Sequence, residues 1–489
     1  MLQLLGKFFR LILVVYVFTL AYQWWKPLPE FMTQPVRVFN VSESGVHFFA
    51  DTTLVDGKGK RQTDQHIWTE ITKTIGSAKH SILLDMFLYN DFQGEHPETT
   101  KALSRDLTNA LVAKKTENKH VVIALITDPI NTIYGGVVSP YFEKLRQNGI
   151  LIITTDLTEL PDSNLFYGAL WRPFFSWSGN STTGGWLTHP FQYGGSKVTL
   201  RSWLALLNFK ANHRKLLVAD EPVVKNGKEV GQKMVTIITS SNPHDASSAH
   251  GNVALKVDDH IWRDVLQNEN MIAQFSNSRL PAYNIEEVND ATGSLRVSLL
   301  RDQLIKNKAL ELLGNAKQND HIDLVMFYLS DRDIISALVN AANRGVYVRI
   351  ILDPNKDAFG FTKNGIPNQP VAKELLNSSN NSIQLRWCDT HGEQCHAKLL
   401  MGDTATSSFM MLGSANFTRR NIGGYNLEED IFVEGSGRFA AWKDANNYFE
   451  KMWTNKGGSS TQPYETYQDD TVWKSSLYRI MEATGLSSF

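Results

Sequence analysis

The sequence has no excess of charge of either sign and almost no cysteine. It contains 49 basic and 50 acidic residues among 489, which leaves a net charge of −1. A chain so balanced lacks the charge signature of a protein that follows a long polyanion. A local basic pocket would still suffice for a smaller phosphodiester. The two cysteines allow at most one disulfide within the chain.

A long hydrophobic run occurs at the N-terminus, where residues 8–25 follow Lys7 and include Arg10. A membrane-spanning helix needs about 20 apolar residues, so this run is slightly short. Trp24 and Trp25 are typical of interfacial anchors, and the basic residues precede the helix. We therefore expect a single-pass anchor over residues 1–26, with the body on the periplasmic side of a cell membrane. A cleaved signal peptide is an alternative, although no Ala-x-Ala site is present. A buried N-terminal helix is another.

Cys388 and Cys395 are separated by six residues, just before His396. Outside the cytoplasm the two thiols can pair and make the approach to His396 rigid. Free thiols remain an alternative. A metal site that also uses His391 and His396 is a third, but it would consume a histidine that the chemistry below requires. We therefore expect neither a metal nor a cofactor.

One motif occurs twice, which is very unlikely by chance. Each copy reads His-x-Lys-x4-Asp and is followed by Ser-x-Asn or Ser-Ser-Asn. The first copy comprises His213, Lys215 and Asp220, then Ser240 and Asn242. The second comprises His396, Lys398 and Asp403, then Ser414 and Asn416.

The spacing within the motif suits phosphoryl transfer. Short apolar runs follow Lys215 and Lys398 and predict buried strands. Alternate residues of a strand share a face, so each copy offers an imidazole and an ammonium to one point. Two copies that face each other can surround one phosphate. A neutral imidazole attacks phosphorus, a protonated one donates to the leaving oxygen, and the lysines hold the other oxygens.

The two halves of the chain also share an order of predicted elements, which indicates an α/β fold with a mixed sheet between helices in each half. Paired strands end in Asp128-Pro129 and Asp353-Pro354. We place a first domain at 27–290, a second at 291–436 and C-terminal helices at 437–489. Within the last segment, 439–453 and 471–486 should be helical and 454–463 a flexible linker.

The first half carries an insertion at about 156–202, rich in tryptophan, phenylalanine and glycine and without helical or strand periodicity. Since it leads directly into the first motif, it should lie at the mouth of the site. It can serve as a lid or an acyl-chain groove that dips into a membrane surface. Alternatively, it is a loop that packs its aromatic residues on the sheet.

The paired motifs resemble those of the phospholipase D superfamily over roughly residues 66–435. The resemblance implies two pseudo-repeated domains with one active site at their interface, and a phosphohistidine intermediate formed without metal. By analogy, His213 is the nucleophile and His396 the general acid. Lys215 and Lys398 bind phosphate, while the Ser-x-Asn residues line the pocket. Asp220 and Asp403 are interpreted as supports of their strands within the motif.

The resemblance also implies an acidic residue that supports a motif histidine, and Glu428 fits, with Glu429 as fallback. The first half has no matching glutamate, so its histidine should lack this partner unless Asp245, His250 or Asn252 substitutes. Among other candidates, Arg419 and Arg420 can approach phosphate. His189 and His250 are the remaining histidines expected near the site.

We therefore expect a membrane-associated phosphodiesterase or phosphatidyltransferase, similar to phospholipase D or cardiolipin synthase, that acts on phospholipid headgroups. Its partners would be a phospholipid and an alcohol or water, and no partner protein should be needed. An extracytoplasmic nuclease would use the same core residues but a basic, open groove. A non-catalytic lipid-binding protein would keep the fold without the motifs.

Overall fold

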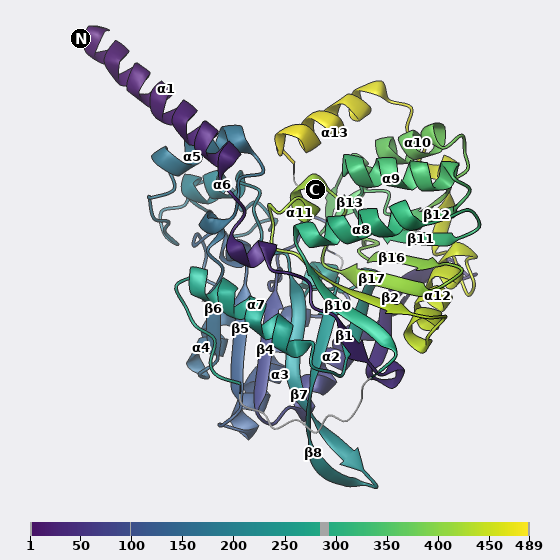
Figure 1. Ribbon diagram of the computed structural model, residues 1–489. Coiled ribbons are helices and arrows are strands. Elements are labelled where there is room, and N and C mark those ends of the chain that lie inside the picture. The colour runs from purple at the N-terminus through teal and green to yellow at the C-terminus, as the bar shows by residue number, and fades with distance from the viewer. Residues whose placement is uncertain (1, 98, 284–292, 488–489) are drawn as a thin grey trace.

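The computed structural model describes residues 2–97, 99–283 and 293–487, and its strands form two large sheets (Figure 1). The first sheet has the order β3-β2-β9-β8-β7-β4-β5-β6. Its strands are β2 (Val46–Val55), β3 (Arg61–Asp64), β4 (Ser81–Met86), β5 (Val122–Thr127), β6 (Leu151–Thr154), β7 (Lys215–Lys225), β8 (Lys228–Thr239) and β9 (Asn252–Val257).

The second sheet has the order β1-β10-β18-β17-β16-β11-β12-β15-β19. Its strands are β1 (Phe39–Val41), β10 (Leu295–Arg301), β11 (His321–Met326), β12 (Tyr347–Leu352), β15 (Gln384–Cys388), β16 (Lys398–Asp403), β17 (Ser408–Gly413), β18 (Glu429–Gly435) and β19 (Thr461–Pro463). A small hairpin, β13 (Asp357–Ala358) and β14 (Phe361–Thr362), stands apart.

The predicted repeat is confirmed strand by strand. In the first half, β4, β5 and β6 are parallel and β7 runs antiparallel to β4. In the second half, β11, β12 and β15 are parallel and β16 runs antiparallel to β11. The strands that carry the motif lysines, β7 and β16, are therefore interior strands of their sheets, hydrogen-bonded on both sides.

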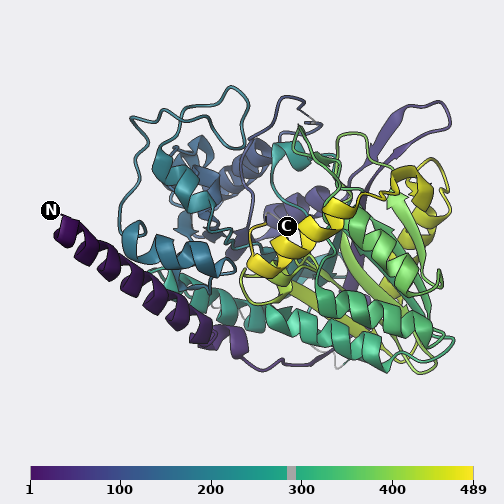
Figure 2. The same cartoon turned by 90° about the horizontal axis from the view of Figure 1, so that it is seen from above.

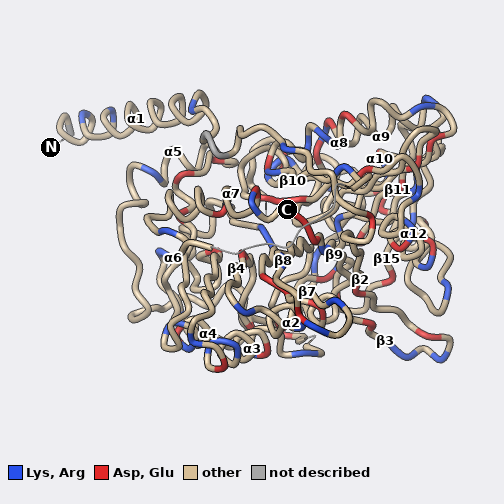
Figure 3. Tube along the Cα trace, turned by 60° about the horizontal axis from the view of Figure 1, so that its bottom comes forward, with Lys and Arg blue, Asp and Glu red and all other residues tan. Residues whose placement is uncertain are grey.

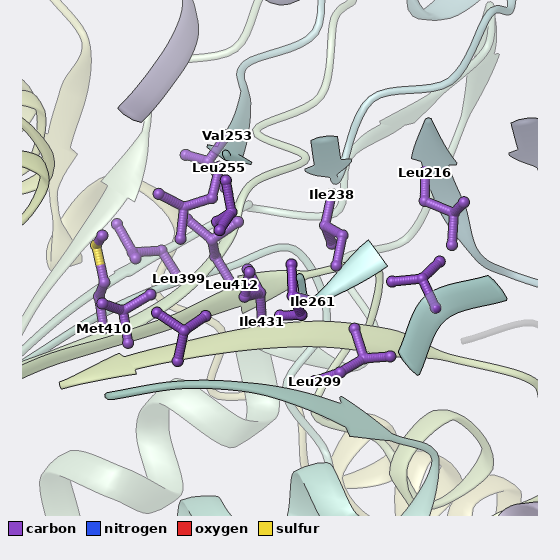
Figure 4. Packing of buried hydrophobic residues seen from close by; sticks show 14 of the residues in the cluster. Leu216, Ile238, Val253, Leu255, Ile261, Leu299, Leu399, Met410, Leu412 and Ile431 are labelled. Atoms are coloured by element: carbon purple, nitrogen blue, oxygen red, sulfur yellow. The ribbon is translucent and has the colours of Figure 1, made fainter. Parts of the chain in front are cut away.

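The two sheets pack face to face, and their facing side chains form one shared core (Figure 4). Alternation along each motif strand explains this. Leu216 and Leu399 point into the layer between the sheets, whereas their neighbours Leu217 and Leu400 point outward, under the helices. The halves are thus joined by apolar packing as well as by one chain.

Helices cover the outer face of each sheet. The first is covered by α2 (Ile67–Ser77), α3 (Leu103–Glu117) and α4 (Pro140–Gln147). The second is covered by α8 (Gln303–Asn315), α9 (Arg332–Asn343) and α10 (Asn368–Ser378). Two further helices, α7 (Trp262–Phe275) and α12 (Ala440–Trp453), pack against the layer between the sheets.

Three sequence-based expectations require correction or fall outside the described residues. The insertion is not irregular throughout, because it contains α5 (Leu165–Phe174) and runs into α6 (Leu200–Leu206). Asn164 and Thr199 cap these helices, a local signal that the aromatic composition obscured. Residues 454–463 are not only a linker, since β19 pairs with β15. The expected boundary at 290/291 lies outside the described residues.

The first and the last helix both lie in the upper part of Figure 1, and Figure 2 shows the first helix projecting beyond the body. Helix α1 (Leu2–Trp25) extends away from the body, but its second half packs on α5, where the Tyr16 hydroxyl donates to the Phe166 carbonyl at 3.3 Å. The last helix, α13 (Val472–Thr484), docks on α10 through the buried Tyr478. Trp473 and Ile480 of α13 remain exposed.

Truncating a side chain in the layer between the sheets should test this architecture. Leu412 is fully buried there, so Leu412→Ala is expected to lower the free energy of unfolding by about 3 kcal/mol. Val224→Ala, on the exposed hairpin between β7 and β8, should change it by less than about 0.5 kcal/mol. Urea unfolding of the detergent-solubilised protein measures both. Equal midpoints for the two variants would contradict a shared close-packed core.

Candidate active site

The two motif histidines come together because each half binds the backbone of the other. The His213 N–H donates to the Leu427 carbonyl at 2.8 Å, and the His396 N–H donates to the Gly251 carbonyl at 2.8 Å. These bonds relate the halves by a pseudo-twofold arrangement. They place each histidine just before an interior strand and directly beside a segment of the opposite half.

A buried aspartate fixes each approach to a histidine from within its own half. Asp128 accepts the N–H of Asn212 at 2.7 Å, and Asp353 accepts the N–H of Cys395 at 2.8 Å. Asp128 directly follows β5, and Asp353 directly follows β12. In each half this strand is the neighbour of the first strand of the repeat. The repeated Asp-Pro in the sequence is therefore a signal of the site, in addition to the histidine–lysine motif.

The residues that support the histidines are exchanged between the halves, which corrects an expectation. His213 Nδ1 lies 2.9 Å from Glu428 Oε2, so the first histidine does have a carboxylate, supplied by the second half. His396 Nδ1 lies 3.1 Å from Asn252 Oδ1. The histidine without a carboxylate is therefore His396. The fallback Glu429 instead binds Asn268 behind the site.

The two serines also occupy different places from those expected. Ser414 donates to Glu428, and Ser240 donates to Asn252 Oδ1 at 3.0 Å. Both serines lie behind the supporting residues and do not line the cavity that contains the histidines. Asn242 and Asn416 do line it, as expected.

Lys215 and Lys398 are buried without a carboxylate partner in the described part of the chain. Each ammonium donates to the carbonyl of its own motif histidine, Lys398 Nζ at 2.7 Å from the His396 oxygen. Lys215 also lies over the Phe87 ring, 5.0 Å from its centroid, and Lys398 over Phe327 at 5.1 Å. The ammonium groups are thus held in place but not neutralised.

This concentration of basic groups perturbs their protonation. Burial lowers the pKa of Lys215 to about 7 and that of Lys398 well below its usual range. Burial also lowers the pKa of His213 to about 4. Burial would raise the pKa of Glu428, but His213 and Lys215 outweigh it and lower that pKa to about 2. At neutral pH we therefore assign an ionised Glu428 that accepts a hydrogen bond from the neutral His213.

A cavity of about 390 Å³ opens over the two histidines between the halves. Its walls are mostly apolar and come from both halves, from the end of the insertion and from the β13–β14 hairpin. The aromatic and aliphatic lining residues include Phe87, Phe92, Ile130, Phe191, Leu206, Phe209, Phe327, Phe359 and Phe361. Such a cavity has room for an apolar ligand beside the two histidines.

The motif aspartates lie away from the cavity. Asp220 accepts three backbone N–H groups at the start of β4, from Lys79 and His80 at 2.9 Å and from Ser81 at 2.7 Å. Asp403 accepts from Ser408 Oγ at 2.7 Å and pairs with Arg438. Their role as supports of the strands stays a prediction.

Cys388 and Cys395 form a disulfide with an S–S distance of 2.05 Å, and this bridge ties the end of β15 to the residue before His396. His250 lies beside the site, with its ring centroid 5.7 Å from that of His396. His189 does not line the cavity, but its ring packs on that of the lining residue Phe92, with 4.5 Å between the ring centroids.

A family model described as cardiolipin synthase, PLD-like domain, matches residues 309–453. The phosphatidylserine synthase of Haemophilus influenzae Rd KW20 has a similar structure, with a TM-score of 0.55 and 9% identity over 94% of this chain and 97% of that one. The phospholipase D family member Nuc from Salmonella typhimurium is 22% identical, with a TM-score of 0.27, over 35% of this chain and 98% of its own. No match was found among the curated proteins.

Inorganic phosphate should bind at this site because the two lysines lack a counter-charge. We expect it to raise the midpoint of thermal unfolding of the detergent-solubilised protein, by an amount that grows with phosphate concentration. Differential scanning fluorimetry measures this shift. Lys398→Gln should remove most of the gain, whereas Lys225→Gln, on the turn between β7 and β8, should retain it. A gain retained in Lys398→Gln would show that phosphate binds elsewhere.

Proposed function

From its place in the phospholipase D superfamily, we propose that this chain is a membrane-associated phosphodiesterase that transfers phosphatidyl groups through a phosphohistidine. The observation that carries the proposal is the pair of cross-half contacts. His213 and His396 are each engaged at Nδ1 and line one cavity. Both Nε2 atoms therefore remain for chemistry at a single phosphorus.

In the first step, the His213 Nε2 lone pair forms a bond to phosphorus as the bond to the headgroup oxygen breaks. His396 Nε2 donates its proton to that oxygen, and the headgroup leaves as an alcohol. In the second step, water or another alcohol gives its proton back to His396 and attacks phosphorus. The P–N bond then breaks and returns its electron pair to His213. Lys215, Lys398, Asn242 and Asn416 stabilise the non-bridging oxygens.

The unequal supports favour His213 as the nucleophile. Phosphorylation at Nε2 makes its ring cationic, and the ionised Glu428 at Nδ1 stabilises that charge. Asn252 offers His396 only a neutral amide oxygen, so the imidazolium form of His396 is less stabilised and is a stronger acid. The two histidines have the same side chain, but their neighbours differ. One is therefore a good nucleophile and the other a good proton donor.

The cavity favours a lipid over a nucleic acid. Its lining is mainly aromatic and aliphatic, with basic groups only at particular points. Basic and acidic residues are intermixed along the described part of the chain (Figure 3), and the net charge of −1 is unlike that of a protein that follows a nucleic-acid backbone. A diacylglycerol phosphate, by contrast, combines one anionic centre with apolar chains.

Membrane association is supported by the end of the molecule from which helix α1 projects. By its length and composition, helix α1 is long and apolar enough to cross a bilayer, with Lys7 and Arg10 near its start. Exposed aromatic side chains of the insertion, Phe166, Trp177 and Trp186, add apolar surface on the neighbouring segment. Because basic residues precede the span, we place the body outside the cytoplasm. The cavity-lining elements α6, β13 and α11 (Arg419–Ile422) lie at this end too (Figures 1 and 2).

Replacing either histidine should abolish lipid turnover. His213→Ala and His396→Ala are each expected to lower kcat at least about 10³-fold, because nucleophile and proton donor are both needed. The assay uses detergent-solubilised protein, mixed phosphatidylglycerol and phosphatidylethanolamine, added glycerol, and mass spectrometry of the products. Phosphatidic acid identifies hydrolysis, and a new phosphatidyl alcohol or cardiolipin identifies transfer.

Two further results of this assay would overturn parts of the proposal. Loss of activity on adding a chelator would contradict a reaction without metal. Cleavage of a nucleic-acid substrate, tested alongside, in the absence of lipid turnover would move the assignment to a nuclease. Turnover of neither substrate, with intact folding, would favour a lipid-binding protein.

The amide at residue 252 should set the pH range of the reaction. His396 must be protonated in the first step, so the rate falls as pH rises through its pKa, which burial and Lys398 hold well below the usual range. Asn252→Asp places a carboxylate at Nδ1 and should raise that pKa by about 1 unit or more. The descending limb of the kcat profile then moves to higher pH. Asn252→Ala removes the support without adding charge and should lower kcat without an upward shift of the limb.

A further inference from the structure

The wall of the catalytic cavity carries a guanidinium group that the mechanism above does not use. Arg420, at the N-terminal turn of α11, lines the cavity. Its Nη1 donates to the carbonyls of Phe209 at 3.3 Å and Ser487 at 3.1 Å. Its Nε is buried without a hydrogen-bond partner. Within residues 2–97, 99–283 and 293–487, no carboxylate lies within ion-pair distance of it.

Neighbouring basic residues with a structural role differ from Arg420. Arg419 donates to the carbonyl of Ser163 at 3.2 Å and to the Tyr425 hydroxyl at 3.0 Å, and it does not line the cavity. Lys210 lines the cavity but is paired with Asp162 at 2.5 Å. Arg420 as a whole is half-buried, but its Nε is buried without a hydrogen-bond partner and no carboxylate of the described residues pairs with it. An anion that arrives with the substrate would supply both an acceptor and a counter-charge.

A second unpaired cation lies on the same wall. Lys363 follows the β13–β14 hairpin, and its ammonium contacts the Tyr328 hydroxyl and lies over that ring, 4.9 Å from the centroid. Tyr328 and Lys363 both line the cavity. Burial lowers the pKa of Arg420, while the charge of Glu428 and then the phenol of Tyr328 raise it, so this guanidinium also lies within electrostatic reach of Tyr328.

The cations of the cavity exceed what one phosphodiester requires. A phosphodiester carries a single negative charge, and Lys215 and Lys398 already serve it. Arg420 and Lys363 are two more cations without a carboxylate partner in the described structure. A guanidinium, an ammonium and a hydroxyl together provide the donors that a phosphate group accepts.

We propose that Arg420, Lys363 and Tyr328 form a second anion subsite, which binds an additional phosphate group on the headgroup of the lipid substrate. This inference rests on the proposed function for its lipid, and it narrows the substrate class. The preferred lipid carries two phosphates, the one that reacts at the histidines and another that is recognised by Arg420. A zwitterionic or singly charged lipid would leave this subsite empty.

Binding of soluble anions tests the subsite independently of turnover. Isothermal titration calorimetry on the full chain in detergent should show pyrophosphate binding at least tenfold more tightly than inorganic phosphate. Arg420→Gln and Lys363→Gln should each remove most of this preference, and Arg419→Gln should keep it. Equal affinities in the unchanged protein, or a preference that survives in both cavity variants, would overturn the proposal.

Turnover then identifies the source of the second phosphate. With phosphatidylglycerol phosphate compared with phosphatidylglycerol, Arg420→Gln should raise KM at least tenfold for the first lipid and change it less than twofold for the second. The same KM change for both lipids, or an effect seen only when the added acceptor bears the phosphate, would contradict a subsite for the lipid headgroup. If no lipid is turned over at all, the proposed function fails, whereas the calorimetric preference still decides whether the anion subsite exists.

Discussion

The hydrogen bonds that each half supplies to the other half's histidine are the constraint on which this site depends. Glu428 holds His213, and Asn252 holds His396. The backbone bonds beside them, and the apolar layer between the sheets, fix the distance across which these contacts form. The consequence is that neither half contains a complete site. A shift between the sheets would disturb both imidazoles together, which gives the large shared core a direct role in the chemistry.

Electrostatics in the cavity follow from burying many basic groups with few acids. Lys215 and Lys398 are fixed by carbonyl oxygens and not by carboxylates. Arg420 is likewise held by carbonyl oxygens, and Lys363 is held by the Tyr328 hydroxyl. Without ligand, burial lowers the pKa of both lysines and of His396 and so disfavours their charged forms. The anionic substrate proposed above would favour the charged forms, including the protonated His396 that donates in the first step. Binding and proton donation are therefore coupled through charge.

The sequence predicted the repeat, the interior strands and the histidine–lysine pairs, because each of these has a local pattern: apolar runs after Lys215 and Lys398, and Asp-Pro after matching strands. It also singled out Glu428 and mentioned Asn252. It assigned their partners wrongly. The half that supports each histidine depends on how the two sheets pack, and this packing cannot be read from any spacing along the chain. The same reason explains why the positions of the two serines were predicted wrongly, since they lie one layer behind the cavity. Helix α5 was missed because aromatic residues masked a capped helix. Lys363 and Tyr328 have no motif at all and meet only in the folded wall.

The packing of α1 on α5 has a consequence for kinetics. The helix is not a loose tether, since its second half is seated on the insertion beside the cavity. In a bilayer such a joint sets the height and tilt at which the cavity meets the lipid surface. For the lipid substrate proposed above, the search is then two-dimensional. Its rate should follow the mole fraction of substrate lipid in the surface, and diluting the surface with inert lipid should slow it even at constant bulk concentration.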